Sequence, residues 1–287
     1  MRPSESVRLA WASDIHFDHG PPEGIVQFFD WLRESGAEAL LLGGDITNAV
    51  ELEQTLAEIA EMAAMPVHFV LGNHDYYGSS IAGVRARMAA LRNPRLHWLP
   101  KTGPHILAPG VSLVGHGGWG DTRIGKFVGS PVFLTDYHAI AELREVFDPS
   151  EWMGTFRRGS ALQKELRRRG QEAAEMLAPH LEEAAATSHT VLILMHVPPF
   201  REATWHQGRH SDEYWLPGFS CGAVGNLLRD AALAHPDVRF VGLCGHTHGG
   251  GTAEMAPNLV VHTQAAEYGR PDFDILEVGP DSFRIRS

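Results

Sequence analysis

Five short apolar runs along the chain are each followed directly by Asp, Asn or His, and this repeated order constrains the fold more than any other feature. Short apolar runs bounded by turn residues are typical of buried strands. In open α/β sheets, ligands bind just beyond the carboxyl ends of the strands. The sequence therefore predicts that the five polar segments meet at one sheet edge. These segments are Asp14-Ile15-His16 after Val7–Ser13, Gly43-Gly44-Asp45 after Ala39–Leu42, Gly72-Asn73-His74-Asp75 after Val67–Leu71, His196 after Val191–Met195, and Gly245-His246-Thr247-His248 after Val238–Cys244.

Helix-like stretches lie between the first three predicted strands, at Gly24–Ser35 and Glu51–Ala64. Strands that alternate with helices in this way favour an α/β fold, with helices packed on the faces of a sheet. Other apolar runs follow one another closely, with turn residues between them, which suggests hairpins and therefore mixed sheets. These further strands are predicted at Leu96–Trp98, Ile106–Ala108, Val111–Val114, Thr252–Ala256, Leu259–His262, Ile275–Val278 and Phe283–Ile285.

We expect a single domain over residues 1–287, because no linker, repeat or low-complexity segment divides the chain. The strand pattern fades over a mainly helical excursion at about residues 119–189, where Tyr137–Phe147 and Ser160–Ala186 are predicted helices. The second of these carries the basic cluster Arg167-Arg168-Arg169. Two interpretations of this cluster stay open: a solvated helix face, or a patch that attracts an anionic substrate.

Charge and composition narrow the partners that we expect. Asp and Glu number 35 against 24 Lys and Arg, a formal charge of -11, whereas a broad nucleic-acid binder usually has a basic balance. We therefore do not expect a nucleic-acid partner. Together with the site chemistry described below, the charge favours a small phosphoester substrate. No apolar run approaches the ~18 residues of a membrane span, and no signal peptide is evident, so we expect a cytoplasmic protein without a membrane partner. The two cysteines, Cys221 and Cys244, predict no disulfide framework. The oligomeric state stays open.

The donor types in the five polar segments predict a site for two metal ions. Mixed imidazole and carboxylate donors suit manganese, iron, nickel or zinc, whereas calcium prefers oxygen donors alone. No Cys-x-x-Cys pair indicates a structural zinc site. The candidate donors are too many for one tetrahedral ion, and they divide naturally between two ions that share a carboxylate. The candidate ligands are Asp14, His16, Asp45, Asn73, His196, His246 and His248.

Taken together and in this order, the five segments resemble the motifs of the calcineurin-like metallophosphoesterase superfamily. The resemblance spans residues 14–248. It implies a four-layer α/β sandwich in which helices flank two facing mixed β-sheets, with a dinuclear metal site at the strand carboxyl ends. It also implies how the two ions divide the ligands. One ion would be bound by Asp14, His16 and His248, the other by Asn73, His196 and His246, and Asp45 would bridge them.

The resemblance further implies a hydrolytic mechanism with two catalytic residues, His74 and Asp75. Two ions about 3.5–4 Å apart would activate a bridging hydroxide that attacks phosphorus in line. His74 would contact the phosphate, neutralise developing charge and donate a proton to the leaving oxygen. Asp75 would orient His74 from behind.

Departures from other branches of the superfamily place the chain nearest the small bacterial phosphodiesterases. Protein serine/threonine phosphatases continue with Asp-Arg-Gly after the bridging aspartate, whereas here Ile46-Thr47-Asn48 follows Asp45. Lipid A precursor hydrolases usually have Arg at the position of His74, and purple acid phosphatases use a tyrosine ligand that has no match here. DNA-repair nucleases of the superfamily share Gly-Asn-His-Asp but usually add a DNA-binding cap domain.

The leading hypothesis is therefore hydrolysis of a small phosphodiester, plausibly a nucleotide. The alternatives are a metal-dependent nuclease and a catalytically inactive scaffold or binding module. Trp119 and Trp205 are predicted to offer faces on which a base could stack, and the loop Trp205–His210 to help roof the cleft. His19 and His116 are expected to lie behind the ligands or to serve the fold.

Overall fold

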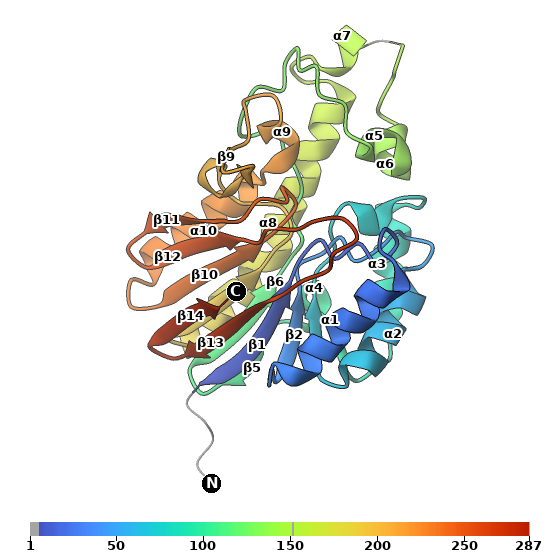
Figure 1. Ribbon diagram of the computed structural model, residues 1–287. Helices are drawn as coiled ribbons and strands as arrows, with labels where there is room; N and C mark the ends of the chain where they lie inside the picture. Colours follow the sequence, from blue (N-terminus) through green and yellow to red (C-terminus); the bar gives the residue numbers. More distant parts are fainter. Residues whose placement is uncertain (1–5, 151, 287) are drawn as a thin grey trace.

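The computed structural model describes residues 6–150 and 152–286 and consists of two six-stranded mixed sheets that face each other, with helices on both outer sides (Figure 1). This is the predicted sandwich. Two further strands, β8 (Trp205–His206) and β9 (Arg209–His210), form a small separate hairpin. Among the described residues, no helix has both the length and the apolar character needed to cross a bilayer.

The first sheet has the strand order β14-β13-β1-β2-β3-β4. Strands β1 to β4 run parallel, whereas β13 runs antiparallel to β1 and β14 runs antiparallel to β13. The first sheet thus places β1 between a strand from the beginning of the chain and one from its end. Its strands are β1 (Val7–Ala12), β2 (Ala39–Leu42), β3 (Val67–Phe69), β4 (Leu96–Trp98), β13 (Asp274–Gly279) and β14 (Ser282–Arg286).

The second sheet has the order β11-β12-β10-β7-β6-β5. Its four inner strands run parallel to one another, and the edge strands β5 and β11 pair antiparallel with β6 and β12. Its strands are β5 (His105–Ala108), β6 (Val111–Gly115), β7 (Thr190–Leu194), β10 (Arg239–Cys244), β11 (Gly251–Ala256) and β12 (Leu259–Thr263).

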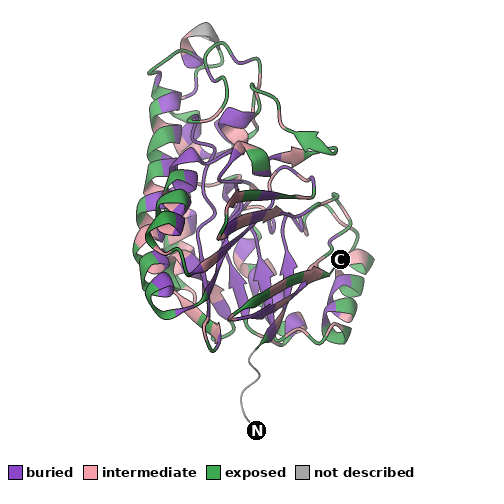
Figure 2. Ribbon diagram, turned by 90° about the vertical axis from the view of Figure 1, so that its left-hand side faces the viewer, coloured by how far each residue is buried: buried purple, intermediate pink, exposed green. Residues whose placement is uncertain are grey.

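Successive side chains along each strand point to opposite faces of the sheet, so the apolar core forms separate layers. On β1, Leu9 and Trp11 face the second sheet, where they belong to the same buried cluster as Leu192 and Leu243. Ala10, on the opposite face, packs with residues of the helices α1 (Pro22–Glu34), α2 (Leu52–Ala63) and α3 (Ile81–Ala90). The long helix α8 (Ala161–Thr187) and α10 (Gly222–Ala234) cover the second sheet. Figure 2 shows the inner strands buried, whereas edge strands such as β11 and β14 have exposed residues.

The excursion departs from the prediction in its first half. The predicted helix Tyr137–Phe147 is two short helices, α5 (Asp136–Ala139) and α6 (Ala141–Arg144), separated by Ile140 in extended conformation. A further turn, α7 (Trp152–Thr155), precedes α8, which agrees closely with the predicted Ser160–Ala186. The Ser160 hydroxyl accepts a hydrogen bond from the Gln163 amide, so this residue caps α8 as serine commonly does.

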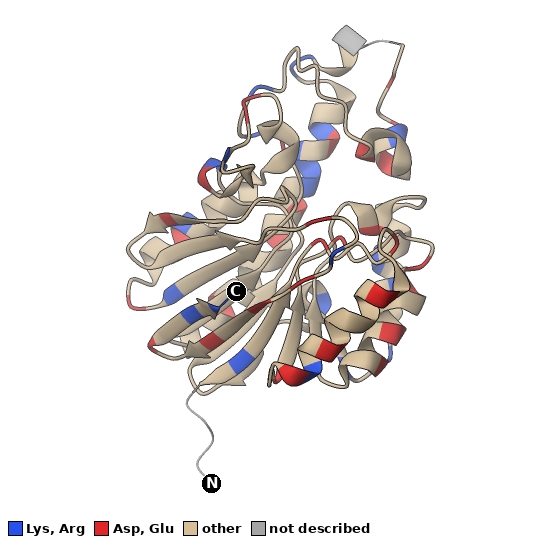
Figure 3. Ribbon diagram, in the orientation of Figure 1, with Lys and Arg blue, Asp and Glu red and all other residues tan. Residues whose placement is uncertain are grey.

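The basic cluster on α8 fits neither interpretation fully. Figure 3 shows positions of Lys and Arg along the upper part of α8. Arg169 is only 6% exposed and lies within 4.0 Å of the carboxylates of Glu142, Glu165 and Glu172, while Arg168 also pairs with Glu165. Arg169 therefore joins α6 to α8 through Glu142, whereas Arg168 pairs with acidic residues of α8 itself.

The fold also contains several elements that the sequence pattern does not predict. Strands β1 and β3 end earlier than predicted, because Ser13 and Val70-Leu71 already belong to the turns at the sheet edge. The remaining short elements are α4 (Leu99–Thr102), α9 (Leu216–Phe219) and the 3₁₀ turns η1 (His74–Tyr76) and η2 (Arg201–Ala203).

Candidate metal centre

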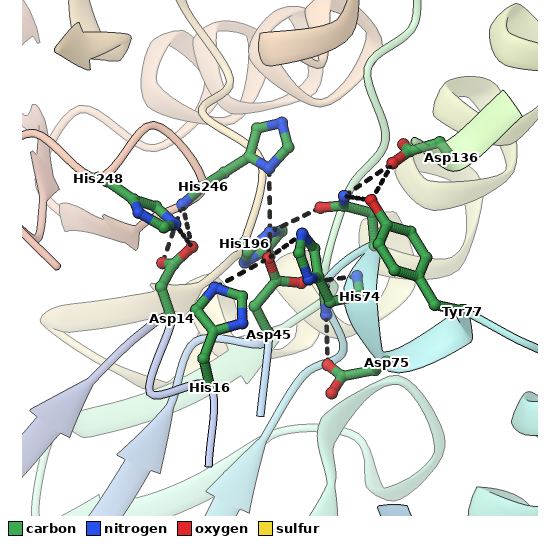
Figure 4. Close-up of polar contacts among 12 residues, drawn as sticks. Asp14, His16, Asp45, His74, Asp75, Tyr77, Asp136, His196, His246 and His248 are labelled. Carbon is green, nitrogen blue, oxygen red and sulfur yellow. Dashed lines mark hydrogen bonds and ion pairs between the residues drawn. The ribbon is translucent and has the colours of Figure 1, made fainter. Parts of the chain in front are cut away.

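All five polar segments meet at the carboxyl-end edge shared by the two sheets, as Figure 4 shows. The chain turns sharply there, since the amides of Asp14 and His16 donate hydrogen bonds to the carbonyls of Gly44 and Asp45, both at 3.0 Å. Several of the predicted ligands have a positive φ, which costs non-glycine residues free energy and is tolerated mainly at functional sites. These are Asp14 (54°), His16 (40°), Asp45 (51°), His246 (68°) and His248 (57°).

The first group of predicted ligands consists of Asp14, His16 and His248. One oxygen of Asp14 lies 3.2 Å from Nε2 of His248. The His16 side chain is fully buried, and neither of its ring nitrogens has a hydrogen-bond partner among the described residues. A buried imidazole without a partner is costly, so a ligand for its lone pair would resolve this deficit.

The second group consists of His196, His246 and Asn73, and backbone carbonyls select the tautomers of both histidines. Nδ1 of His196 lies 3.0 Å from the Gly43 carbonyl, and Nε2 of His246 lies 3.2 Å from the Gly218 carbonyl. A nitrogen facing a carbonyl carries a proton, so in the neutral rings the other nitrogens, 3.1 Å apart, have lone pairs directed at each other. The Asn73 oxygen lies 3.2 Å from the same His196 nitrogen. Such a convergence of lone pairs fits a cation.

Asp45 lies between the two groups, as the prediction of a bridging residue requires. Its Oδ2 is 3.8 Å from Nε2 of His16 and 3.4 Å from Nε2 of His196. Its Oδ1 accepts a hydrogen bond of 2.9 Å from the His74 amide. One carboxylate oxygen is therefore within reach of donors from both groups.

Electrostatics favour positive charge at this edge. Burial would raise the pKa of Asp45 and Asp14, but the surrounding histidines overcome this, so that the pKa of Asp45 falls well below its usual range and that of Asp14 to about 2. Burial would lower the pKa of His196, yet Asp45 and Asp14 raise it to about 9. Burial instead dominates at His246, whose pKa falls to about 3. Two ionised carboxylates thus stand ready to hold cations.

The residues present fit two transition-metal ions. In each of the sets Asp14, His16, His248 and Asp45, His196, His246, the donor atoms lie within 4.8 Å of one another. Imidazole nitrogens with carbonyl-fixed tautomers and buried carboxylates are the donors that such ions prefer. The predicted division of the ligands between the two ions stays a prediction, and these two sets are compatible with it.

His74 lies on the solvent side of this centre and differs from the ligands in its contacts. Its side chain is 22% exposed, and its Nε2 lies 3.9 Å from the Asp45 carboxylate. The ring stacks on Tyr77 with 4.3 Å between centroids and 29° between planes. A half-open imidazole held by stacking is suited to contact a substrate at the ions.

Asp75 contacts other groups than the predicted one. Its carboxylate accepts hydrogen bonds from the amides of Ile46 (2.9 Å), Thr47 (3.1 Å) and Gly72 (2.8 Å), and it is fully buried. None of the described hydrogen bonds joins it to the His74 ring. Asp75 therefore ties the turns after β2 and β3 together, and it acts on His74 only through the backbone. Burial, with Asp45 close by, raises the pKa of Asp75 to about 7.

Two residues that the sequence analysis missed support the site: Asp136 of the excursion and Tyr77, which follows η1. Asp136 of α5 accepts hydrogen bonds from the Tyr77 hydroxyl (2.6 Å) and from Nδ2 of Asn73 (2.9 Å). The second bond fixes the amide of Asn73 so that its oxygen faces His196. No motif marks Asp136, because its position depends on how the excursion folds back over the sheet edge.

A pocket of about 340 Å³ opens above the ligands, and aromatic side chains form much of its lining. No Lys or Arg belongs to this lining among the residues that the structure describes. Large rings stand partly exposed at its mouth: Phe133 (42%), Trp215 (40%) and Tyr268 (50%). The Tyr268 ring lies over the first ligand group, 4.5 Å from the ring of His16 and 4.9 Å from that of His248.

The two tryptophans predicted to stack a base lie elsewhere. Trp119 is 4% exposed and packs against Tyr76 in the helix-side core. Trp205 packs so closely on Gly251 that a Cβ there would lie 2.4 Å from its ring. The prediction of stacking on Trp119 and Trp205 is therefore wrong, since both rings are used in packing. Only His206, from the predicted loop, reaches the pocket lining.

His116 and His19, which the sequence analysis places outside the ligand set, differ in their surroundings. His116 is buried and its Nδ1 accepts a hydrogen bond from the Gly118 amide (3.0 Å), which serves the fold. His19 has a half-exposed side chain, and its donor atoms lie within 4.8 Å of those of His16 and His74. His19 thus borders the centre on the side of the first group.

A two-sheet sandwich with two clusters of histidine and aspartate at its carboxyl-end edge defines a class of dinuclear metallohydrolases. The calcineurin-like phosphoesterase family model matches residues 7–250, which is most of the chain. The protein therefore belongs to the calcineurin-like phosphoesterase family, and it is a metal-dependent phosphoester hydrolase. The family implies two divalent metal ions.

Solved structures with the same fold are distant in sequence. A dimetal phosphatase from Danio rerio has a TM-score of 0.60 at 16% identity, covering 98% of this chain and 95% of its own. The phosphopantetheinyl hydrolase of Mycobacterium tuberculosis has a TM-score of 0.59 at 16% identity, covering 91% and 90%. GAP50, the anchor in the inner membrane complex of Plasmodium, has a TM-score of 0.53 at 13% identity, covering 98% and 83%. At these identities the likeness extends to the fold alone. No curated protein sequence matches the chain.

Proposed function

We propose that this hydrolase cleaves small phosphodiesters, and the observation that carries the proposal is the lining of its pocket. A phosphomonoester has close to two negative charges at neutral pH, and proteins commonly bind such groups through Arg or Lys. The described lining has neither, and it includes the carboxylates of Asp45 and Asp136. A diester, with a single negative charge, needs less neutralisation.

The roles of the residues follow from their positions. Asp14, His16 and His248 would hold one ion and Asn73, His196 and His246 the other, with Asp45 between them. When bound, the two ions activate water and neutralise the phosphoryl oxygens. Manganese, iron, nickel and zinc all suit these donors.

His74 is the protein group best placed to assist departure of the leaving group. Its half-open ring lines the pocket beside Asp45. When protonated, it donates a proton to the ester oxygen as the bond from phosphorus to that oxygen breaks. Tyr77, stacked on the ring, holds it in place for this transfer.

Substrate size is limited by the same pocket. A volume of about 340 Å³ is typical of small-molecule sites. The formal charge of -11 gives no general attraction for polyanions such as duplex DNA. These features favour a small diester, plausibly a nucleotide, over a nuclease substrate. The complete set of ligands and His74 favours an enzyme over an inactive scaffold.

The test compares bis(p-nitrophenyl) phosphate with p-nitrophenyl phosphate as substrates of the metal-loaded protein. We expect kcat/KM to be at least tenfold higher for the diester, and activity to be lost with a chelator and restored by added Mn²⁺. Asp45→Asn should lower metal content and both activities together. A higher kcat/KM for the monoester would contradict the diester proposal.

A further inference from the structure

A second pocket adjoins the metal pocket and is not needed to hold the scissile phosphate. It encloses about 410 Å³, and His206, Trp215 and Phe219 line both pockets. Its other walls come from the β8–β9 hairpin and the segment that leads into α9. Figure 1 shows α9 and β9 next to each other above the strand ends. A ligand at the ions could therefore extend directly into this second pocket.

Aromatic rings connect the metal ligands to the second pocket. The Phe219 ring lies 4.9 Å from the ring of the ligand His246 and 5.1 Å from the ring of Trp215. Trp215 is 40% exposed and lines both pockets, so part of its ring surface is open to a ligand there. Because Trp215 lines both pockets, a planar ring that stacks on it would still border the metal pocket.

The opposite wall offers one cation. Arg209, from β9, lines the second pocket and forms none of the ion pairs found among the described residues. Neighbouring charges are already used: Arg201 pairs with Glu213, and the Asp212 carboxylate accepts hydrogen bonds from the amides of Tyr214 and Trp215. The guanidinium of Arg209 thus remains to bind an anionic group.

We propose that the second pocket is a subsite for the far arm of the diester, and that it takes a planar heteroaromatic ring on Trp215 and Phe219 and an additional anionic group on Arg209. A nucleoside that bears a second phosphate has this chemistry. The proposal rests on the phosphodiesterase function proposed above and names the substrate class for it.

Three diesters with the same p-nitrophenol leaving group test the proposal. They are methyl p-nitrophenyl phosphate, thymidine 5′-(p-nitrophenyl phosphate) and the same thymidine ester with a 3′-phosphate. We expect kcat/KM to rise along this series. Trp215→Ala should reduce the advantage of the thymidine ester over the methyl ester roughly 5- to 100-fold, the range for one base stacked on an aromatic ring, and Trp215→Phe should retain most of it.

The charge and the controls are tested separately. Arg209→Gln should remove only the additional gain that the 3′-phosphate gives. Trp31→Ala, which alters another exposed tryptophan (50%) on α1, should change none of the ratios. Equal kcat/KM for all three diesters in the wild-type protein, or an equal loss for the methyl ester in Trp215→Ala, would overturn the subsite. Failure to hydrolyse any diester while hydrolysing monoesters would instead overturn the proposed function.

Discussion

Asp136 shows how a side chain outside the metal-binding motifs can determine how a ligand is presented. The amide of Asn73 can point either its oxygen or its nitrogen at the metal position, and only the oxygen is a good donor. Because Nδ2 of Asn73 donates to Asp136, the oxygen is directed toward His196. The same carboxylate holds the hydroxyl of Tyr77, whose ring supports His74. One buried acid thus contacts both a predicted ligand and the tyrosine that supports the proposed proton donor.

We expect Asp136→Ala to lower affinity for the second metal ion and turnover by roughly 10- to 100-fold, the usual cost of losing a hydrogen-bond partner behind a ligand. Asp136→Asn keeps an oxygen acceptor and should lose less. Metal titration by calorimetry and kcat under saturating metal check this. Asp121→Asn, a change at another buried acid of the excursion that binds the start of α10, is the control and should leave metal affinity intact. Unchanged metal affinity in Asp136→Ala would contradict the role.

At this scale the sequence predicts the ligands better than their surroundings. Asp14, Asp45 and His196 follow strands directly, so the strand pattern alone brings them to one edge. The positions of Trp119 and Trp205 could not be predicted in this way, because a glycine-rich neighbourhood does not reveal whether a ring faces a cleft or fills the space above a glycine. Trp215, on which we propose that a ring stacks, lies in a segment without strand or helix periodicity.

Between elements, a cluster of three histidines links the strands β3 and β4 of the first sheet to β5 of the second. His68 on β3 and His97 on β4 are paired in register, and His105 begins β5 in the opposite sheet. Their ring centroids lie 4.6–4.8 Å apart. Burial lowers the pKa of all three, to about 3 for His68 and about 4 for His105. Neighbouring imidazoles also disfavour protonation of His68 and His105.

The stability of the protein should therefore fall in mild acid. An unfolded histidine takes up a proton near pH 6.5, whereas these folded ones resist it, so the unfolded state binds more protons below that pH. Stability is complete above pH 6.5 and is lost as the pH falls toward 4, by up to about 1.4 kcal/mol per pH unit for the buried His68, and by less for His97 and His105, which are partly screened by solvent. Thermal unfolding between pH 7.5 and 4.5 measures the slope, and His68→Gln should flatten it. An unchanged slope in this variant would show that the cluster contributes nothing.

The sequence predicts which segments form strands better than it predicts the order of those strands in the sheets. Most strands match the predicted runs within one or two residues, because apolar runs and turn residues are local signals. The pairing of β13 with β1, in the register Val7↔Val278 to Trp11↔Asp274, depends on contacts between the two ends of the chain and has no local signal.

At the scale of the whole molecule, we expect the C-terminal strands to support the metal centre, although none of the predicted ligands lies on them. All seven predicted ligands precede residue 249, and the family match ends at residue 250. Yet β13 pairs with the full length of β1, the strand that delivers Asp14 and His16, and buries Leu276 and Val278 between the sheets. Without β13, β1 would become an exposed edge above an open core.

We expect a chain that ends at residue 250 to lose metal binding and cooperative unfolding although it retains every ligand. Deletion of residues 282–287 is the control, because it removes only the edge strand β14, whose residues are exposed or half-buried. Metal content after dialysis and thermal unfolding of both truncated proteins check the expectation. Two bound ions in the chain ending at residue 250 would contradict it.

This position of β13 also sets the order of events during synthesis. Every aspartate and histidine of the site is synthesised before β13 and β14, which complete the first sheet, so we expect these side chains to be only separate, weak chelators on the incomplete chain. Because the bridging position of Asp45 exists only once both sheets have formed, discrimination between manganese, iron, nickel and zinc cannot begin on the nascent chain. The choice of metal belongs to the finished fold and to the ions available when it forms.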